Sequence, residues 1–214
     1  MEEAFSIIAQ AIGMTVLLTA SSGIIGMVAG VPLVLLSRSR FAVLRIVYAA
    51  FVHVVRGVPP LVWLFVIFFG IAELGWVIAP VPSAIGTLSI IAAASMAEIY
   101  RGGLNAIGHG QYEAGWALSL SRWDVAKDIV LPQLLRAVSP TAATYFVGLL
   151  KDSALASIIG VAEITYVTNE QVTLNGHGLL LFSYAAAIYL VLSAVLGIVS
   201  RRLHARLTGR YAVV

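Results

Sequence analysis

The chain has 214 residues, of which 60% are hydrophobic and only 11% are charged. Soluble proteins carry roughly 25% charged residues, so this composition excludes an ordinary soluble domain and indicates an integral membrane protein. The formal net charge of +3 does not indicate nucleic-acid binding, because the basic residues lie in short segments beside apolar runs. The sequence contains no cysteine and therefore no disulfide.

Five apolar runs are long enough for membrane spans, since a crossing helix needs about 20 residues. In chain order they are 11–36, 58–79, 82–99, 141–164 and 179–200. The Met-Glu-Glu start lacks the basic region of a secretory signal, so the first run is predicted to be a retained span. A further apolar stretch, 41–55, contains Arg45 and His53. We expect it to lie at the interface or to lead as a bent helix into the second span, and do not count it as a crossing.

The basic residues collect after the first span, between the third and fourth spans, and after the fifth span. With five spans these three segments share one side of the membrane, and basic residues favour the cytoplasmic side. All but one of the thirteen basic residues are therefore predicted to be cytoplasmic, the exception being Lys151. The predicted fold is an all-α membrane protein with five transmembrane helices, the N-terminus outside and the C-terminus cytoplasmic. Its basic tail, 201–210, would act as an anchor.

The longest connection, of roughly 40 residues, lies between the third and fourth spans. In it Tyr112, Trp116 and Leu120 recur at i, i+4 and i+8, which predicts a helix with one apolar face. Two interpretations stay open, a solvated connector and a docking element for a soluble partner.

A second helix is predicted after a turn at 120–121. Ser121 and Asp124 form a candidate capping box at its start, and the helix is expected to run into Ile129. Pro132 is expected to stop or kink it before the fourth span.

Four segments together resemble a known family. Glu113-Ala114-Gly115, then Ser119, then Ile129-Val130-Leu131-Pro132 resemble the E-A-A-x3-G-x9-I-x-L-P loop of ATP-binding-cassette importer permeases. The segments V-R-G-V-P-P-L (55–61), A-E-I-Y-R-G-G (97–103) and L-L-K-D-S-A-L (149–155) are similar to those typical of its polar amino-acid branch, which serves histidine, arginine, glutamine and glutamate. Gly115 stands where a second alanine is usual, and Ser119 stands where glycine is usual.

The resemblance implies a type I importer permease, with one transmembrane domain over 1–214 and a cytoplasmic coupling loop at about 102–140. It implies a multi-pass protein of the bacterial inner membrane that imports polar amino acids. Its expected partners are a second permease chain, identical or sister, two copies of a cytoplasmic ATPase, and an extracytoplasmic amino-acid-binding protein. The resemblance also implies a coupling helix made of Glu113, Ala114, Gly115, Trp116, Ala117, Leu118, Ser119 and Leu120.

The chain is not expected to be an enzyme or to bind a cofactor. It lacks the G-x-x-x-x-G-K-[ST] phosphate loop, so ATP and Mg would be used by the partner ATPase. No catalytic residue is predicted, because the sequence contains no G-x-S-x-G elbow. The four histidines lack ligand spacing, so no metal site is predicted.

Two acids inside predicted spans are candidates for substrate binding, because an ionisable residue in a membrane is costly. Glu98 lies in the third span and Asp152 in the fourth. Arg101 at i+3 offers Glu98 an ordinary ion pair, whereas Lys151 cannot share a helix face with Asp152. The two acids would suit the ammonium group of an amino acid or a cationic side chain. Ser95, Met96 and Ser153 are candidates through adjacency alone.

Two further questions stay open at this stage. The alternative function is an ion-coupled secondary amino-acid transporter, although the halves show no inverted repeat and five spans divide poorly into two equal units. Gly26 and Gly30 form a G-x-x-x-G pattern, which serves either internal packing or chain pairing. The transported amino acid and the choice between homodimer and heterodimer are likewise open.

Overall fold

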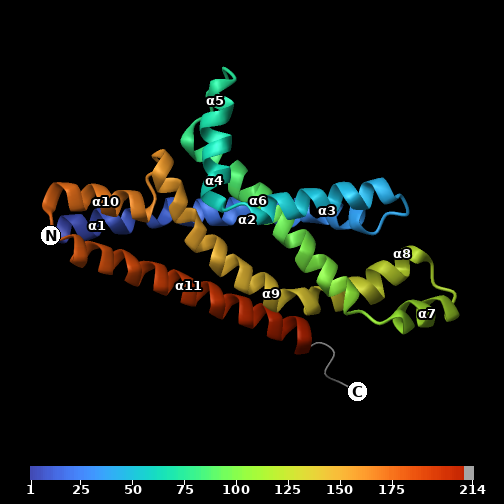
Figure 1. The fold of residues 1–214 in the computed structure, drawn as a ribbon. Helices are drawn as coiled ribbons and strands as arrows, with labels where there is room; N and C mark the ends of the chain where they lie inside the picture. The colour runs from blue at the N-terminus through green and yellow to red at the C-terminus, as the bar shows by residue number, and fades with distance from the viewer. Residues whose placement is uncertain (210–214) are drawn as a thin grey trace.

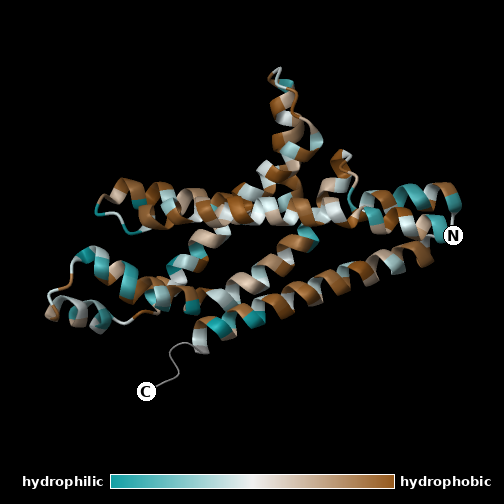
Figure 2. Ribbon diagram, turned by 180° about the vertical axis from the view of Figure 1, so that it is seen from behind, coloured by the Kyte–Doolittle hydropathy of each residue, from teal (hydrophilic) through white to brown (hydrophobic). Residues whose placement is uncertain are grey.

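The computed structural model describes residues 1–209, and over this range the chain folds into helices joined by turns (Figure 1). Hydrophilic residues gather at the two ends of the molecule, and hydrophobic residues dominate its middle (Figure 2). Four helical segments are long and apolar enough to cross a membrane, and a bent helix pair gives a fifth. Arg210, at the end of the predicted basic tail, lies outside the described residues.

The first span consists of α1 (Glu2–Gln10) and α2 (Ile12–Ser37), which packs along α6 (Pro80–Asn105). Small residues at the contact let the two backbones approach, as is usual between membrane helices. A Cβ atom at Gly26 would clash with Ala92, and one at Gly30 would lie 3.0 Å from the Cβ of Met96. The G-x-x-x-G pattern therefore serves packing within the chain.

The second span is longer than the apolar run predicted at 58–79. It consists of α3 (Ala42–Gly57), α4 (Pro60–Phe65), the π-helix η1 (Val66–Gly70) and α5 (Ile71–Glu73). These helices bend by 100° at the break before Pro60 (Figure 1). Proline lacks an N–H group and disfavours helical conformation in the residue before it, so the two prolines enforce the break.

Helix α3 is the first part of this bent span, which agrees with the second of the two alternatives for stretch 41–55. It packs its buried residues Tyr48, Val52 and Val55 against Ile91 and its neighbours on α6. The stretch is therefore part of the helix bundle and does not lie apart at an interface.

The fourth span begins earlier and ends earlier than predicted. One helical run from Arg122 to Ile159 comprises α8 (Arg122–Asp124), the π-helix η2 (Val125–Val130), α9 (Leu131–Asp152) and the 3-10 helix η3 (Ser153–Ile159). Pro132 does not stop this run. The wide turns of the π-helix η2 come directly before it, so they accommodate both the missing N–H group and the bulk of the proline ring. The run ends at Gly160, which has a left-handed φ of 87°.

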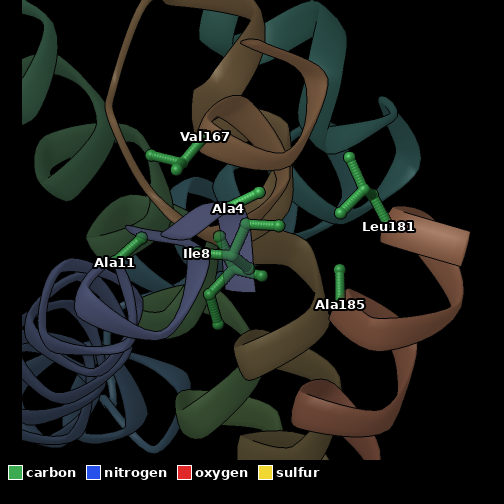
Figure 3. Packing of buried hydrophobic residues seen from close by; sticks show 7 residues of the cluster. Ala4, Ile8, Ala11, Val167, Leu181 and Ala185 are labelled. Atoms are coloured by element: carbon green, nitrogen blue, oxygen red, sulfur yellow. The ribbon is translucent and has the colours of Figure 1, made fainter. Parts of the chain in front are cut away.

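Two further helices complete the fold, α10 (Ile164–Asn175) and α11 (Gly178–Gly209). Residues 165–178 fall between the fourth and fifth predicted spans, yet they form α10, which lies beside α1 (Figure 1). Its residue Val167 joins Ala4, Ile8 and Leu181 in a buried cluster (Figure 3). α11 continues beyond the predicted end at 200, so the described part of the basic tail is helical. A short helix, α7 (His109–Ala117), lies at the opposite end of the molecule (Figure 1).

Candidate functional site

A cavity of about 660 Å³ opens between α6 and α9, beside the end of α3. Small residues of both helices, among them Gly102, Gly103 and Ala137, leave the room for it. Its polar lining consists of Arg56, Ser95, Glu98, Thr141, Thr144 and Tyr145. The cavity thus combines two charged groups of opposite sign with several hydroxyl groups, a lining suited to a small polar molecule.

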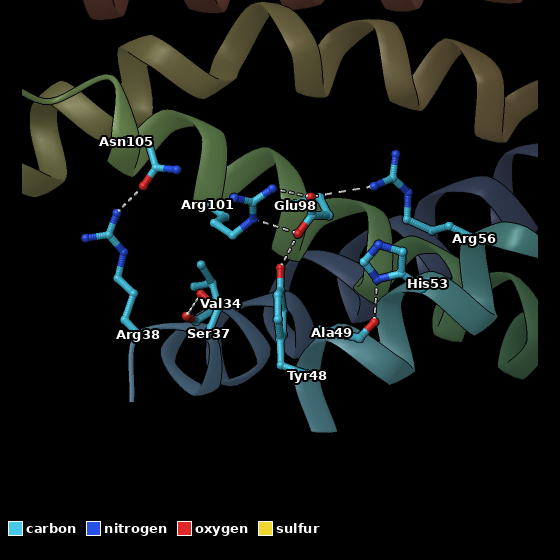
Figure 4. A network of polar contacts seen from close by, with 10 residues as sticks. All are labelled: Val34, Ser37, Arg38, Tyr48, Ala49, His53, Arg56, Glu98, Arg101 and Asn105. Carbon is cyan, nitrogen blue, oxygen red and sulfur yellow. Dashed lines mark hydrogen bonds and ion pairs between the residues drawn. The ribbon is translucent and has the colours of Figure 1, made fainter. Parts of the chain in front are cut away.

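Glu98 is the centre of a polar network on one side of this cavity (Figure 4). Arg101 donates from Nε to Oε1 over 2.8 Å and from Nη2 to Oε2 over 2.7 Å. The Tyr48 hydroxyl donates to Oε1 over 2.5 Å. The ordinary i, i+3 ion pair considered for Glu98 is therefore present, and both carboxylate oxygens are engaged within the protein.

Arg56 is the loosely held charge of the network. Its Nη1 lies 3.8 Å from Oε2 of Glu98, and its side chain is 48% exposed. One carboxylate faces two guanidinium groups, those of Arg56 and Arg101, so the network carries one excess positive charge. In the sequence, Arg56 stood out only as part of the family-like segment V-R-G-V-P-P-L (55–61). Its position at the end of α3, beside the break, is what brings it to the cavity.

The other predicted substrate residues occupy different places. Ser95 lines the cavity, but Met96 is buried against Gly30 of α2. Ser153 is fully buried and donates to the carbonyl of Leu150 over 2.7 Å. Asp152 is half-buried and absent from the cavity lining, but it lies on α9 two helical turns beyond the lining residue Tyr145. The structure therefore brings Ser95 and Glu98 together at the cavity, and it leaves Asp152 outside the lining.

Helix α7 packs against η2 through Gly115, which is buried. A Cβ atom there would lie 2.6 Å from Cγ2 of Val125 and 3.2 Å from Cδ1 of Ile129. This close contact explains why glycine stands where the family usually has alanine. The predicted apolar face through Leu120 is wrong, because the helix ends at Ala117 and Leu120 lies beyond it.

The turn after α7 occurs at 118–120, earlier than predicted. Ser119 adopts a left-handed φ of 58°, the conformation that glycine adopts without strain. Its N–H donates to the carbonyl of Trp116 over 2.9 Å, which satisfies a free carbonyl at the helix end. The predicted capping box is confirmed, since the Ser121 hydroxyl accepts from Asp124 N and the Asp124 side chain accepts from Ser121 N.

The exposed side of this helical hairpin is apolar. Trp116 is 57% exposed and Trp123 is 72% exposed, and the side chain of Leu118 is exposed beside them. Tryptophan side chains bury large areas in protein contacts and are enriched at interfaces. Of the two interpretations of the loop, this surface favours the docking element. The predicted coupling residues Glu113, Ala114 and Ala117 are exposed on the same helix.

One buried acid was missed in the sequence. Glu163 caps α10, accepts from Tyr166 N over 2.9 Å and from the Tyr189 hydroxyl over 2.6 Å, and has 0% exposure. Burial raises the pKa of its carboxyl group. It lay inside a predicted apolar span, and the signal that could have found it is Gly160, which ends that span. Over residues 1–209 no three His, Asp or Glu side chains cluster as a metal site.

The sequence of the chain is similar to those of known membrane proteins. Residues 22–211 match the family model described as binding-protein-dependent transport system inner membrane component. The glutamine transport system permease protein GlnP of Escherichia coli is 36% identical over 159 residues, 73% of each chain. The L-cystine transport system permease protein TcyB of Bacillus subtilis is 32% identical over 194 residues, 90% of this chain and 83% of TcyB.

Solved structures agree with this likeness. The crystal structure of an amino acid ABC transporter with histidines superposes with a TM-score of 0.87 at 27% identity, covering 94% of each chain. An inward-facing MetNI methionine ABC transporter shares the fold, with a TM-score of 0.82 at 21% identity over 97% of this chain.

Nothing in these likenesses supports the ion-coupled alternative. The chain is a transport subunit of the inner membrane and not an enzyme, because a separate subunit hydrolyses ATP in such systems. The chain therefore belongs to the inner membrane components of binding-protein-dependent transport systems, the permease subunits of ATP-binding-cassette importers.

Proposed function

We propose that this chain carries polar amino acids through the cavity between α6 and α9, as one of two permease chains, identical or sister. The relatives named above support this substrate class, since they include glutamine and L-cystine permeases. The proposal places the whole chain, 1–214, in one transmembrane domain. Its N-terminus lies outside and its C-terminus in the cytoplasm, as the distribution of basic residues predicts.

The observation that carries the proposal is the excess positive charge beside the cavity. Arg101 and Tyr48 already satisfy Glu98, so the group left to bind a substrate ion is Arg56. A guanidinium group suits the carboxylate that every amino acid has. The hydroxyls of Ser95 and Tyr145 would bind polar atoms, and Asp152 beyond Tyr145 would attract the ammonium group. Glu98 would act by positioning Arg56.

Binding of labelled amino acids tests this route. Glutamine, arginine, histidine and cystine are offered one at a time to the purified transporter, without a binding protein. Replacing Arg56 by glutamine removes a charge-assisted contact worth about 1.5–3 kcal/mol, so we expect affinity for the bound amino acid to fall at least ten-fold. Arg45→Gln is the matched control, because Arg45 lies on the same helix and binds the carbonyls of Ser39 and Arg40. Equal affinity in both variants would remove Arg56 from the route.

The apolar surface of α7 and α8 is the proposed docking site for the ATPase. Two ATPase copies would bind one such surface on each permease chain, and ATP and Mg would be held by the ATPase. An extracytoplasmic binding protein would deliver the amino acid at the other end of the bundle, where α1 and α10 lie (Figure 1). The exposed Trp116 and Trp123 would be buried on docking, and such aromatic residues dominate many interfaces.

Co-purification from native membranes tests the docking surface. We expect a stoichiometric ATPase with the natural chain and a large loss of it with Trp116→Ala or Glu113→Lys. Trp76→Ala is the matched control, since Trp76 is also strongly exposed but lies in the turn between α5 and α6, far from α7 (Figure 1). Full ATPase retention by both α7 variants would contradict the docking role.

A further inference from the structure

A second crevice, of about 560 Å³, runs between α9 and α11, which lie side by side (Figures 1 and 2). Only Thr144 is shared with the lining of the cavity between α6 and α9. The crevice also lies toward the end of α11 that carries the basic residues. It is thus distinct from the proposed translocation route, although only α9 separates the two.

The lining of the crevice changes from polar to apolar along its length. At the polar end the side chains of Ser139 and His204 share a hydrogen bond of 2.6 Å between Oγ and Nδ1. Ser200 and Arg201 complete this end. Pro140, Ala143 and Val147 form the apolar wall. A ligand that fits this lining has one polar, anionic end and one apolar end.

The positive charge in the crevice is not neutralised by the protein. Arg201 forms no ion pair with a carboxylate of residues 1–209, and 178–209 contains no acidic residue. The only acid on α9 is Asp152, at the far end of that helix. The guanidinium group lies over Gly197, where an added Cβ atom would be 3.4 Å from Nη1. Arg201 is exposed, so its charge lines the crevice and is available to an anion.

The crevice lies where the membrane-facing part of α11 ends. Large apolar side chains of α11, such as Leu190, Val195 and Val199, are exposed as they would be to lipid. The apolar run then gives way to Ser200, Arg201 and Arg202. Basic residues at this level meet the headgroups of the bilayer, and basic pockets between membrane helices bind anionic lipid headgroups.

We infer that this crevice binds one anionic phospholipid. Arg201 binds the phosphate, with the Ser200 hydroxyl as a further partner. One acyl chain lies along Pro140, Ala143 and Val147. An unneutralised guanidinium group lies beside an apolar wall at the depth of the bilayer headgroups. This combination favours a lipid over a soluble anion or a protein segment. This inference stands apart from the proposed amino-acid route, because it rests on α11.

The test measures lipid binding to the full chain with its co-purified subunits, by native mass spectrometry in detergent. The probes are dioleoylphosphatidylglycerol and dioleoylphosphatidylcholine, which differ in net charge. We expect one tightly held phosphatidylglycerol per chain and a clear preference over phosphatidylcholine. Arg201→Gln should weaken phosphatidylglycerol binding at least about five-fold, from the attraction of one basic residue to an anionic headgroup. Arg202→Gln, the neighbouring charge outside the lining, should change it less than two-fold.

A second variant keeps every charge and fills the crevice. Gly197→Leu should also release the lipid, and an unchanged elution volume and unfolding temperature would show that the fold is intact. Equal effects of Arg201→Gln and Arg202→Gln would overturn the inference in favour of general surface attraction. Equal binding of the two lipids would overturn it as well. Displacement of phosphatidylglycerol by millimolar inorganic phosphate would identify a free anion as the ligand and refute the lipid assignment.

Discussion

Replacing Gly115 by alanine introduces the residue that the family usually has, yet we expect it to loosen α7. The new Cβ atom would lie 2.6 Å from Cγ2 of Val125, whereas carbon atoms prefer about 3.5–4.0 Å. Val125 is buried and β-branched, so its methyl groups cannot swing aside. Overpacking costs roughly 1–3 kcal/mol, and alanine recovers up to about 1 kcal/mol of helix propensity. The expected net loss is about 1 kcal/mol, or about five-fold in the local opening equilibrium of α7.

Hydrogen exchange of the α7 amides, followed by mass spectrometry, measures this opening directly. Gly110→Ala is the matched control, because Gly110 lies on the same helix and nothing lies within 4 Å of an added Cβ atom. That variant should slow exchange, whereas Gly115→Ala should speed it. Adding Val125→Ala should restore room for the new methyl group, so the double variant should exchange more slowly than the sum of the two single effects predicts. Slower exchange in Gly115→Ala alone would refute the close-packing argument.

Three further changes test other parts of the fold. Gly26→Ala should lower stability by about 1–3 kcal/mol in thermal unfolding, because the Ala92 backbone cannot move away, whereas Gly13→Ala on α2 meets nothing. Ser119→Gly should relieve about 1 kcal/mol of left-handed strain and slow exchange at the end of α7. Burial raises the pKa of Glu163, so its ionisation destabilises the fold as pH rises from about 4.3, the unfolded value, through the raised folded value. Glu163→Gln should therefore flatten the dependence of unfolding temperature on pH; an unchanged slope would contradict this.

Hydropathy predicted the spans best where the helices are straight. The run 11–36 corresponds closely to α2 (Ile12–Ser37), because crossing a bilayer requires a continuous apolar stretch that is visible locally. It failed where backbone geometry decides the ends. Prolines bend the second span by 100°, and Gly160 ends the fourth before the apolar composition does. Such breaks depend on backbone conformation, to which a hydropathy average is insensitive.

Local motifs of the loop were predictable, and its packing was not. The capping box of Ser121 and Asp124 lies within four residues and was found from spacing alone. The burial of Gly115 depends on Val125 and Ile129, across a turn whose geometry is set by a left-handed Ser119. Periodicity assigned Tyr112, Trp116 and Leu120 to one apolar face, whereas the close contact of the helix is made by a glycine. A small residue carries no hydrophobic signal, so pattern analysis overlooks it.

The same distinction applies to the charges near the cavity. An acid in a membrane span is a reasonable first candidate for binding a cation, and Glu98 was chosen on that ground. Its partner Arg101 is visible three residues away, but Tyr48 is 50 residues away in the chain and Arg56 follows a separate helix. Once these partners are included, one carboxylate is shared by two guanidinium groups. The local excess is then positive, and the carboxylate of an amino acid becomes the better electrostatic match beside Glu98.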